Sequence, residues 1–188
     1  MQRANSIFDS DSETRMFHQI AAVLPEGYRL LPQVPLRSFV NNWIYDNLPF
    51  PHKRWLCQCS VDYAVCIDNV YLTPLIPIEY DGYTNGQTFG SEFLTLDLSD
   101  EAQERKKKFQ FKLDTLAKVG YPLQVFPGDI NYSDSALVRQ LTYSAYACCD
   151  PNVEDADNEY FRLANRLLSR ETCLFTQAIP PHLLTNKN

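Results

Sequence analysis

The sequence predicts an α/β protein in which a mixed β-sheet is flanked by helices. Segments with apolar residues at helical spacing alternate along the chain with short segments of strand character, which is the order that builds such sheets. Hydrophobic residues make up 45% of the 188 residues and charged residues 21%, so the composition excludes a disordered or collagen-like chain. The length suits one domain with a modest extension.

The first half of the chain is predicted to form one helix and three strands, over 12–24, 28–36, 61–67 and 75–81. Apolar residues recur at helical spacing in the first of these segments, and Pro25 ends it. Pro32 and Pro35 place the first strand at a sheet edge, because proline cannot donate to the ladder. Residues 61–67 alternate with period two, and 75–81 return beside them with a distortion expected at Pro77.

The second half is predicted to form a helix over 100–120, a strand over 121–126, and helices over 134–147 and 156–170. Asp100 and Gln103 fit a capping box at the start of the first helix, and Gly120 fits its stop. The expected division is a core over 1–130 and a C-terminal helical extension and tail over 131–188. Residues 37–59 are expected to be an insertion in the core, with one short helix around 39–45.

The charge balance and the hydropathy pattern limit the expected partners. Lys and Arg total 17 against 23 Asp and Glu, and the net charge of −6 argues against a bulk electrostatic grip on nucleic acid or membrane. A local basic strip stays compatible with that charge. The sequence contains no signal-like run and no apolar run of ~20 residues, so we expect a soluble, cytoplasmic protein without a membrane partner.

Three carboxylates stand where the strand pattern favours apolar residues. Asp62 lies inside the strand 61–67, and Glu79 and Asp81 close the strand 75–81 on one face. In an antiparallel hairpin Asp62 and Glu79 become cross-strand neighbours with Cβ atoms at ~5 Å. Like charges at that spacing repel unless one is protonated or both share a cation. The three acids therefore predict a Mg²⁺ or Mn²⁺ site for phosphodiester chemistry.

Two helices are expected to bring further charged side chains to this site. Glu13 falls on the apolar stripe of the first helix, which should pack against the sheet. Lys112 borders the apolar edge of its helix and can lean into a cleft, where its ammonium would orient water or bind a scissile phosphate. Arg105 and Lys108 share its stripe and are the expected nucleic-acid contacts together with Lys112.

Each of these residues also fits an ordinary structural role. Asp62 alone suits a solvated strand end, and Asp81 before Gly82 suits a turn cap. Glu13 fits a first-turn acid that the helix dipole favours, and the basic run fits a solvated helix face. The functional interpretation depends on their joint arrangement.

Five short segments lie around these residues in the order SETRMF, LPQVPL, VDYAV, IPIEYDG and KLDTLAKVGYPL. In this order they resemble the PD-(D/E)XK nuclease superfamily. The likeness is to the branch related to very-short-patch-repair endonucleases and to a bacterial domain family with an Asp-Phe … Glu-Leu-Asp-Gly pattern. The resemblance covers roughly residues 10–127 and implies the restriction-endonuclease-like αβββαβ core.

The resemblance also implies roles for individual residues. Asp62 matches the first metal-binding acid and Glu79 the second. Glu13 matches a helix glutamate found in part of the superfamily. Asp81 stands where the standard motif has its lysine, as is usual in this branch, and Lys112 matches a lysine on the following helix.

The chain departs from the family pattern at two places. The branch often has a histidine shortly after its Asp-Gly pair, whereas Tyr83, Thr84 and Asn85 follow here. Phe109 replaces the acid that often precedes the helix lysine by three residues. These departures bear on catalytic turnover more than on the fold.

The resemblance implies a metal-dependent endonuclease that hydrolyses phosphodiester bonds in DNA, with Mg²⁺ or Mn²⁺, in DNA repair or anti-phage defence. The missing histidine and the charge of −6 favour an alternative. In that alternative the chain is a catalytically inactive nuclease-like module that binds nucleic acid or a protein partner in a larger assembly. A third hypothesis is a structural subunit that docks through its last helices, and a homo-oligomer is compatible with all three.

Two further patterns support weaker interpretations. Cys57 and Cys59 lie near His52, but structural zinc sites use pairs with a wider spacing and a second pair, so we expect mostly buried free thiols. The insertion interleaves aromatic residues with Lys53 and Arg54. This pattern fits base stacking, a hydrophobic flap over the sheet, or a subunit interface.

Overall fold

Four strands form one mixed sheet in the computed structural model, which describes residues 11–81, 100–127, 132–149 and 158–178. In spatial order they are β1 (Tyr28–Pro35), β2 (Ser60–Ile67), β3 (Pro74–Asp81) and β4 (Gln124–Pro127). β2 pairs antiparallel with both β1 and β3, whereas β4 pairs parallel with β3. The sheet and its covering helices confirm the α/β class.

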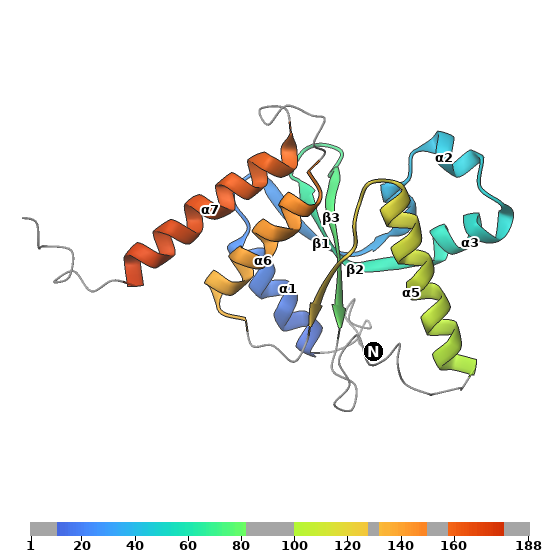
Figure 1. The fold of residues 1–188 in the computed structure, drawn as a ribbon, viewed down its shortest axis with the longest axis horizontal. Helices are drawn as coiled ribbons and strands as arrows, with labels where there is room; N and C mark the ends of the chain where they lie inside the picture. Colours follow the sequence, from blue (N-terminus) through green and yellow to red (C-terminus); the bar gives the residue numbers. More distant parts are fainter. Residues whose placement is uncertain (1–10, 82–99, 128–131, 150–157, 179–188) are drawn as a thin grey trace, which may run out of the picture.

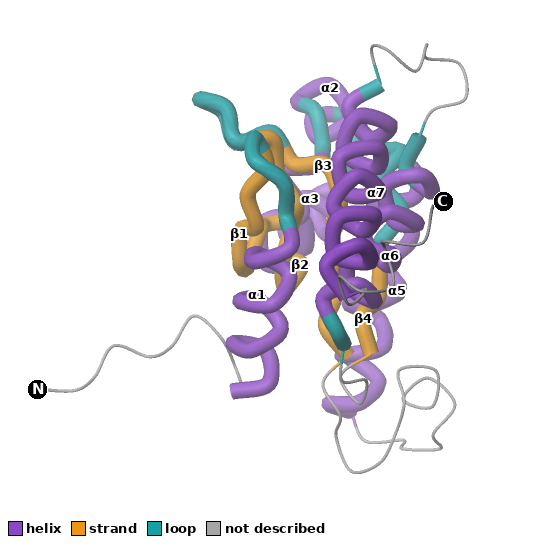
Figure 2. The backbone as a smooth tube through the Cα atoms, turned by 90° about the vertical axis from the view of Figure 1, so that its left-hand side faces the viewer, coloured by secondary structure: helices purple, strands orange, loops and turns teal. Residues whose placement is uncertain are grey.

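Helices lie on both sides of the sheet (Figure 1). One side carries α1 (Asp11–Val23), α6 (Asp134–Ala147) and α7 (Glu159–Ala178). The other side carries the 3₁₀ helix η1 (Leu36–Phe39), α2 (Asn42–Asp46), α3 (Phe50–Gln58) and α5 (Asp100–Lys118). α5 makes the crossover that a parallel β3–β4 pair requires. α6 and α7 run alongside each other in two perpendicular views (Figures 1 and 2).

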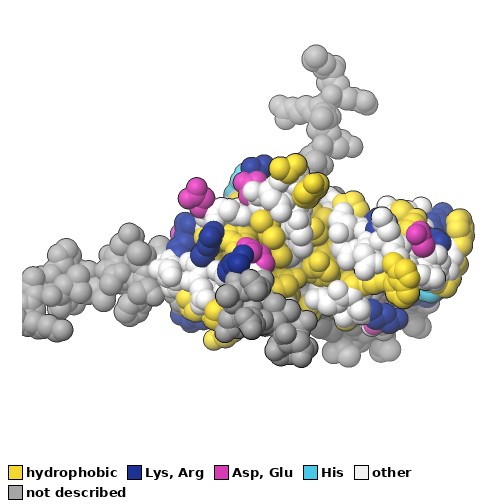
Figure 3. All heavy atoms as spheres, turned by 90° about the horizontal axis from the view of Figure 1, so that it is seen from above, with side chains coloured by type: hydrophobic (Ala, Val, Ile, Leu, Met, Phe, Trp, Pro, Cys, Tyr) yellow, Lys and Arg dark blue, Asp and Glu magenta, His cyan; other side chains and the backbone are white. Residues whose placement is uncertain are grey.

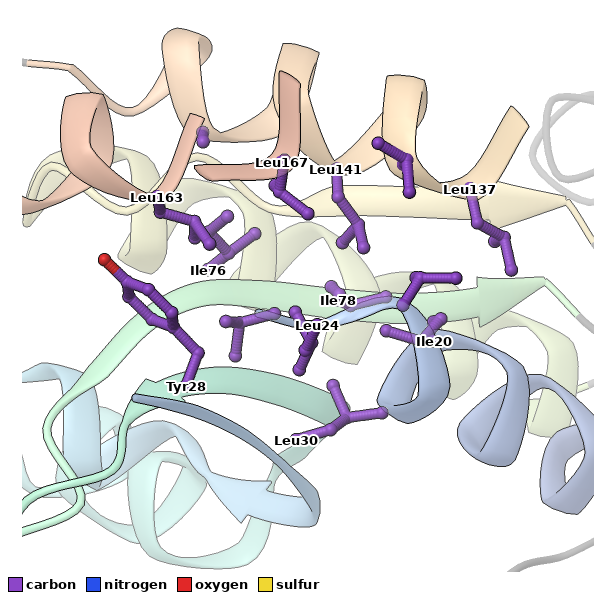
Figure 4. Close-up of a cluster of buried hydrophobic side chains, with 14 of the residues drawn as sticks. Ile20, Leu24, Tyr28, Leu30, Ile76, Ile78, Leu137, Leu141, Leu163 and Leu167 are labelled. Carbon is purple, nitrogen blue, oxygen red and sulfur yellow. The ribbon is translucent and has the colours of Figure 1, made fainter. Parts of the chain in front are cut away.

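Two buried apolar clusters hold these layers together. The larger cluster joins α1, α6 and α7 to the sheet, with Ile20, Ile78 and Leu141 fully buried in it (Figure 4). The smaller cluster lies on the other face, where Leu56 and Leu116 are fully buried. The C-terminal helices, expected as an extension beyond residue 130, thus contribute directly to the core over one face of the sheet.

The strands carry the irregularities that their prolines predict. β1, which contains Pro32 and Pro35, is an edge strand. The register of β2 against β3 shifts between Val65 and Cys66, where the partner changes from Ile76 to Pro74. The distortion expected at Pro77 lies instead at Leu75, which the register skips, and Pro77 itself pairs regularly with Ala64.

The insertion over 37–59 is more helical than predicted. Instead of one short helix around 39–45, the structure has η1, α2 and α3 in succession. Asn41 caps α2 by accepting a hydrogen bond from the backbone N–H of Ile44 at 2.8 Å. Pro49 and Pro51 flank the start of α3, where the missing backbone N–H of a proline costs nothing.

The cysteines that the structure describes are free thiols. Cys59, Cys66 and Cys148 are buried, whereas Cys57 is exposed. Within the described ranges, His, Cys, Asp and Glu side chains form no group of three or more that could hold a metal, so zinc at Cys57 and Cys59 gains no support. None of the described helices has the length and apolar character needed to cross a membrane.

Candidate active site

The pairing of β2 with β3 positions Asp62 and Glu79. Tyr63 pairs with Ile78 in the antiparallel register, and one further step along each strand brings Asp62 opposite Glu79. The Asp62 carboxylate accepts a hydrogen bond at Oδ2 from the backbone N–H of Tyr80 at 2.8 Å. The two acids therefore lie on adjacent strands, as predicted, and the backbone of β3 orients the Asp62 side chain.

Lys112 reaches the same point from α5. Its Nζ donates to Oε1 of Glu79 at 2.8 Å, and the two side chains are only 17% and 12% exposed. Lys112 was expected to lean from the border of its helix into a cleft, and the structure places its ammonium against Glu79. In the structure the ammonium contacts a carboxylate, so it compensates part of the negative charge that the strands collect.

The pKa of Glu79 is raised to about 7, and burial is the largest cause. The neighbouring Asp62 charge raises the pKa further, while Lys112 and a backbone hydrogen bond from Asp62 lower it. Glu79 thus changes between its protonated and ionised forms near neutral pH. A carboxyl group poised in this way can act in proton transfer or can ionise to bind a cation.

Cys59 is a neighbour of this site that the sequence did not indicate. It follows α3 and is buried, and burial raises the pKa of its thiol. The charges of Lys112 and Lys108 lower that pKa, and the charge of Glu79 raises it, so the thiol lies within electrostatic reach of the ion pair. Its position three residues before Asp62 was the only signal available in the sequence.

Glu13 lies on the buried face of α1, as helical counting predicts. It is 6% exposed, and its backbone carbonyl accepts a hydrogen bond from the Tyr63 hydroxyl at 2.8 Å. The pKa of Tyr63 is raised first by burial and then by the charges of Glu13 and Asp62. Glu13 is therefore placed beside Tyr63, the residue that follows Asp62 on β2.

The predicted metal ligands are brought together only in part. Asp62 and Glu79 form a pair, but in the part of the chain that the structure describes no third acid joins them, Glu13 included, to make a metal-binding group. Asp81 pairs with Pro127 at the end of β3, and its side chain lies outside the described part. Mg²⁺ is commonly held by one or two carboxylates with water and phosphate oxygens, so the pair fits that class of cation.

The predicted basic stripe on α5 divides into two environments. Lys108 is exposed and pairs with Glu104, one helical turn earlier, at 3.8 Å. Lys112 is mostly buried against Glu79. The side chain of Arg105 lies outside the described part. Of the described residues in this stripe, only Lys112 contacts the carboxylate pair.

Comparisons of the chain with protein-family models, with curated proteins and with solved structures find no match. The functional argument consequently depends on the site itself. Asp62, Glu79 and Lys112 combine two carboxylates, one of them protonatable near neutral pH, with one ammonium group.

Proposed function

We propose that this protein is a metal-dependent nuclease built on the restriction-endonuclease-like αβββαβ core. One observation carries the proposal: Asp62 and Glu79 lie on adjacent antiparallel strands, and Lys112 of the crossover helix pairs with Glu79. The order α1-β1-β2-β3-α5-β4, with β4 parallel to β3, supports the same core. The resemblance of the surrounding segments to PD-(D/E)XK nucleases points in the same direction.

In this proposal Asp62 and Glu79 hold Mg²⁺ or Mn²⁺, which when bound supplies activation of water and neutralisation of phosphate charge. The backbone N–H of Tyr80 holds one oxygen of the Asp62 carboxylate, so this side chain is already oriented for a cation. Lys112 supplies the positive charge that an approaching phosphodiester needs beside two acids. Glu79 loses its proton when a cation binds, because ligation requires the carboxylate.

The substrate class that we propose is DNA, and the cellular setting is DNA repair or anti-phage defence. The chain carries a net charge of −6, so its grip on a polyanion has to come from local cations. Lys107 and Lys108 are exposed on α5, one turn before Lys112. They are the described cations best placed along the helix to contact phosphates beside the site.

Divalent-dependent cleavage of plasmid DNA and of single- and double-stranded oligonucleotides tests the proposal. Glu79→Gln and Asp62→Asn should abolish cleavage, and Lys112→Met should slow it by roughly 10²-fold or more, as loss of one transition-state donor does. Glu26→Gln is the matched control, since Glu26 is an exposed acid outside the site.

Calorimetric titration with Mn²⁺ completes the test. The wild type should bind Mn²⁺, and Glu79→Gln should bind it far more weakly, whereas Glu26→Gln should behave as the wild type. A wild type that neither cleaves any of these substrates nor binds Mn²⁺ would refute the nuclease proposal.

A second candidate function is a catalytically inactive module that binds nucleic acid or a protein partner. The ion pair of Lys112 with Oε1 of Glu79 favours this candidate, because the ammonium neutralises a carboxylate that a metal ion would otherwise need. It is also favoured by the lack of a third described acid beside the pair. Mn²⁺-independent nucleic-acid binding without cleavage in the same assays would select this candidate.

A further inference from the structure

The helices α2 and α3 lie on the side of the molecule away from α6 and α7 (Figure 1), and each carries an exposed aromatic side chain. Trp43 on α2 is 75% exposed, and Phe50 at the start of α3 is 78% exposed. Figure 3 shows hydrophobic side chains beside Lys and Arg at this end of the molecule. These two large rings on neighbouring helices belong to neither buried cluster, so they are accessible to a ligand.

The same segment carries positive charge, two cations of which lie over the ring of Tyr45. The guanidinium carbon of Arg37 lies 4.2 Å from the centre of the Tyr45 ring, and Nζ of Lys53 lies 5.5 Å from it. Arg54 is exposed on α3. Residues 36–58 contain three cations and one acid, a charge of +2 in a chain whose net charge is −6. The segment is thus complementary to a polyanion, whereas the chain as a whole is not.

The segment is anchored to the helix that supplies Lys112. The ring of His52 stacks on Phe111 of α5 with centroids 5.7 Å apart, and Trp55 meets the same ring edge-on at 5.0 Å. Phe111 directly precedes Lys112 in the chain. A ligand bound on α2 and α3 therefore sits on a platform packed against α5.

We propose that Trp43, Phe50 and Arg54 form a binding surface for single-stranded nucleic acid. Exposed rings stack on bases of any sequence, and neighbouring cations contact the phosphates. A single strand offers its base faces to such rings, whereas a duplex buries them in its own stack. In this proposal the surface binds single-stranded nucleic acid independently of Asp62 and Glu79. It rests on the proposed nuclease function only for its purpose, which is to deliver a strand for cleavage.

Fluorescence anisotropy of a labelled oligo-dT of about twenty nucleotides tests this surface, with EDTA present so that cleavage plays no part. Trp43→Ala and Phe50→Ala should each weaken binding roughly 5-fold or more, because each loses the stacking of one base. Trp43→Phe should retain most of the affinity, since it keeps a ring. Arg54→Gln should make the slope of log affinity against log salt concentration shallower, by the amount expected for the loss of about one phosphate contact.

Tyr143→Ala is the matched control, since Tyr143 is an aromatic residue 65% exposed on α6, across the sheet from α3. Its affinity should equal that of the wild type, and the melting temperatures of all variants should be similar because each changed ring is exposed. Equal affinities of Trp43→Ala and Tyr143→Ala would overturn the proposal, as would a duplex that competes as well as the single strand. Self-association that Trp43→Ala abolishes in sedimentation would instead assign the surface to a second copy of the chain.

The outcomes separate this surface from the nuclease proposal. Single-strand binding that depends on Trp43 in a protein that never cleaves would uphold the surface and refute the nuclease. Divalent-dependent cleavage with binding indifferent to Trp43 and Phe50 would do the reverse. Glu26→Gln, which removes an exposed acid outside both sites, should bind the oligonucleotide as the wild type does.

Discussion

Glu79 pairs with the Lys112 ammonium at 2.8 Å, and yet its pKa is raised to about 7. An ion pair alone would lower the pKa, so burial and the charge of Asp62 together outweigh the pair. The protein thereby keeps a buried carboxyl group whose ionised form is unfavourable. Such strongly shifted pKa values are typical of functional sites, because a purely structural position would favour a residue whose burial is less unfavourable.

The raised pKa of Glu79 predicts how folding stability depends on pH. The pKa rises from an ordinary value of 4.5 to about 7 on folding, so the folded state binds the proton more tightly. The resulting stabilisation is fully present below about pH 4.5 and is lost as the pH rises through 7, a change on the order of 3 kcal/mol. Glu79→Gln cannot titrate and should lose this pH dependence.

Urea unfolding at pH 5 and pH 8 measures the effect. The free energy of unfolding should fall between the two pH values by more in the wild type than in Glu79→Gln. Glu26→Gln, which removes an exposed acid, should follow the wild type. Parallel losses in wild type and Glu79→Gln would show that the proton of Glu79 is not linked to folding.

At the level of single elements, the end of α5 sets the geometry of the crossover. Gly120 follows the helix with a φ of +83°, and the backbone N–H of Tyr121 donates to the carbonyl of Leu116 at 2.9 Å. This αL termination redirects the chain towards β4. The helix that carries Lys112 is thus held at its C-terminal end by a residue that needs a positive φ.

Gly120→Ala should therefore destabilise the fold by ~1 kcal/mol or slightly more, since an L residue is strained at positive φ. An added Cβ would meet no atom within 4 Å, so the cost is conformational and involves no clash. Thermal unfolding gives the measurement. Ala117→Gly is an informative comparison, because it changes an exposed position in the last turn of the same helix, where the cost comes from helix propensity alone.

The sequence predicted most of these elements, because periodicity and turn residues are local signals. The segments 12–24, 61–67 and 134–147 coincide with α1, β2 and α6 to within a residue or two. The helix α3 was missed, and the short helix expected around 39–45 overlaps α2 only in part. The apolar spacing of this segment is obscured by Pro49 and Pro51 and by rings that stay exposed, such as Trp43. The helix α3 packs its His52 and Trp55 rings on Phe111 of α5, a tertiary contact that a local pattern does not report.

The sequence predicted the part of the candidate site that depends on strand pairing. It did not predict contacts between elements that are far apart in the chain. Asp62 and Glu79 follow from antiparallel register, which the hairpin order implies. The position of Lys112 on α5 was visible in the sequence. Its contact with Glu79 could be expected only once α5 was known to cross from β3 to β4. Cys59 precedes Asp62 by three residues at the turn from α3 into β2, but the sequence does not show that α5 brings Lys112 to the same place.

In the molecule as a whole, the last two helices join the sheet in one core. Leu137 and Leu141 of α6 and Leu163 of α7 are fully buried against residues of α1, β1 and β3 (Figure 4). The Tyr28 hydroxyl of β1 also donates to Glu159 of α7 at 2.6 Å. The division into a core over 1–130 and an appended extension therefore does not correspond to two independent hydrophobic cores.

This shared core predicts that α6 is as necessary for folding as the strands. Leu141→Ala should lower the free energy of unfolding by roughly 2–5 kcal/mol, since it removes a fully buried side chain and leaves a cavity between helix and sheet. Leu168→Ala makes the same chemical change on α7 at a position 38% exposed, and it should cost well under half as much. Chemical unfolding of both variants gives the comparison. If α6 and α7 were a loosely docked extension, Leu141→Ala would leave the main unfolding transition of the sheet unchanged, and only a separate, earlier transition would shift.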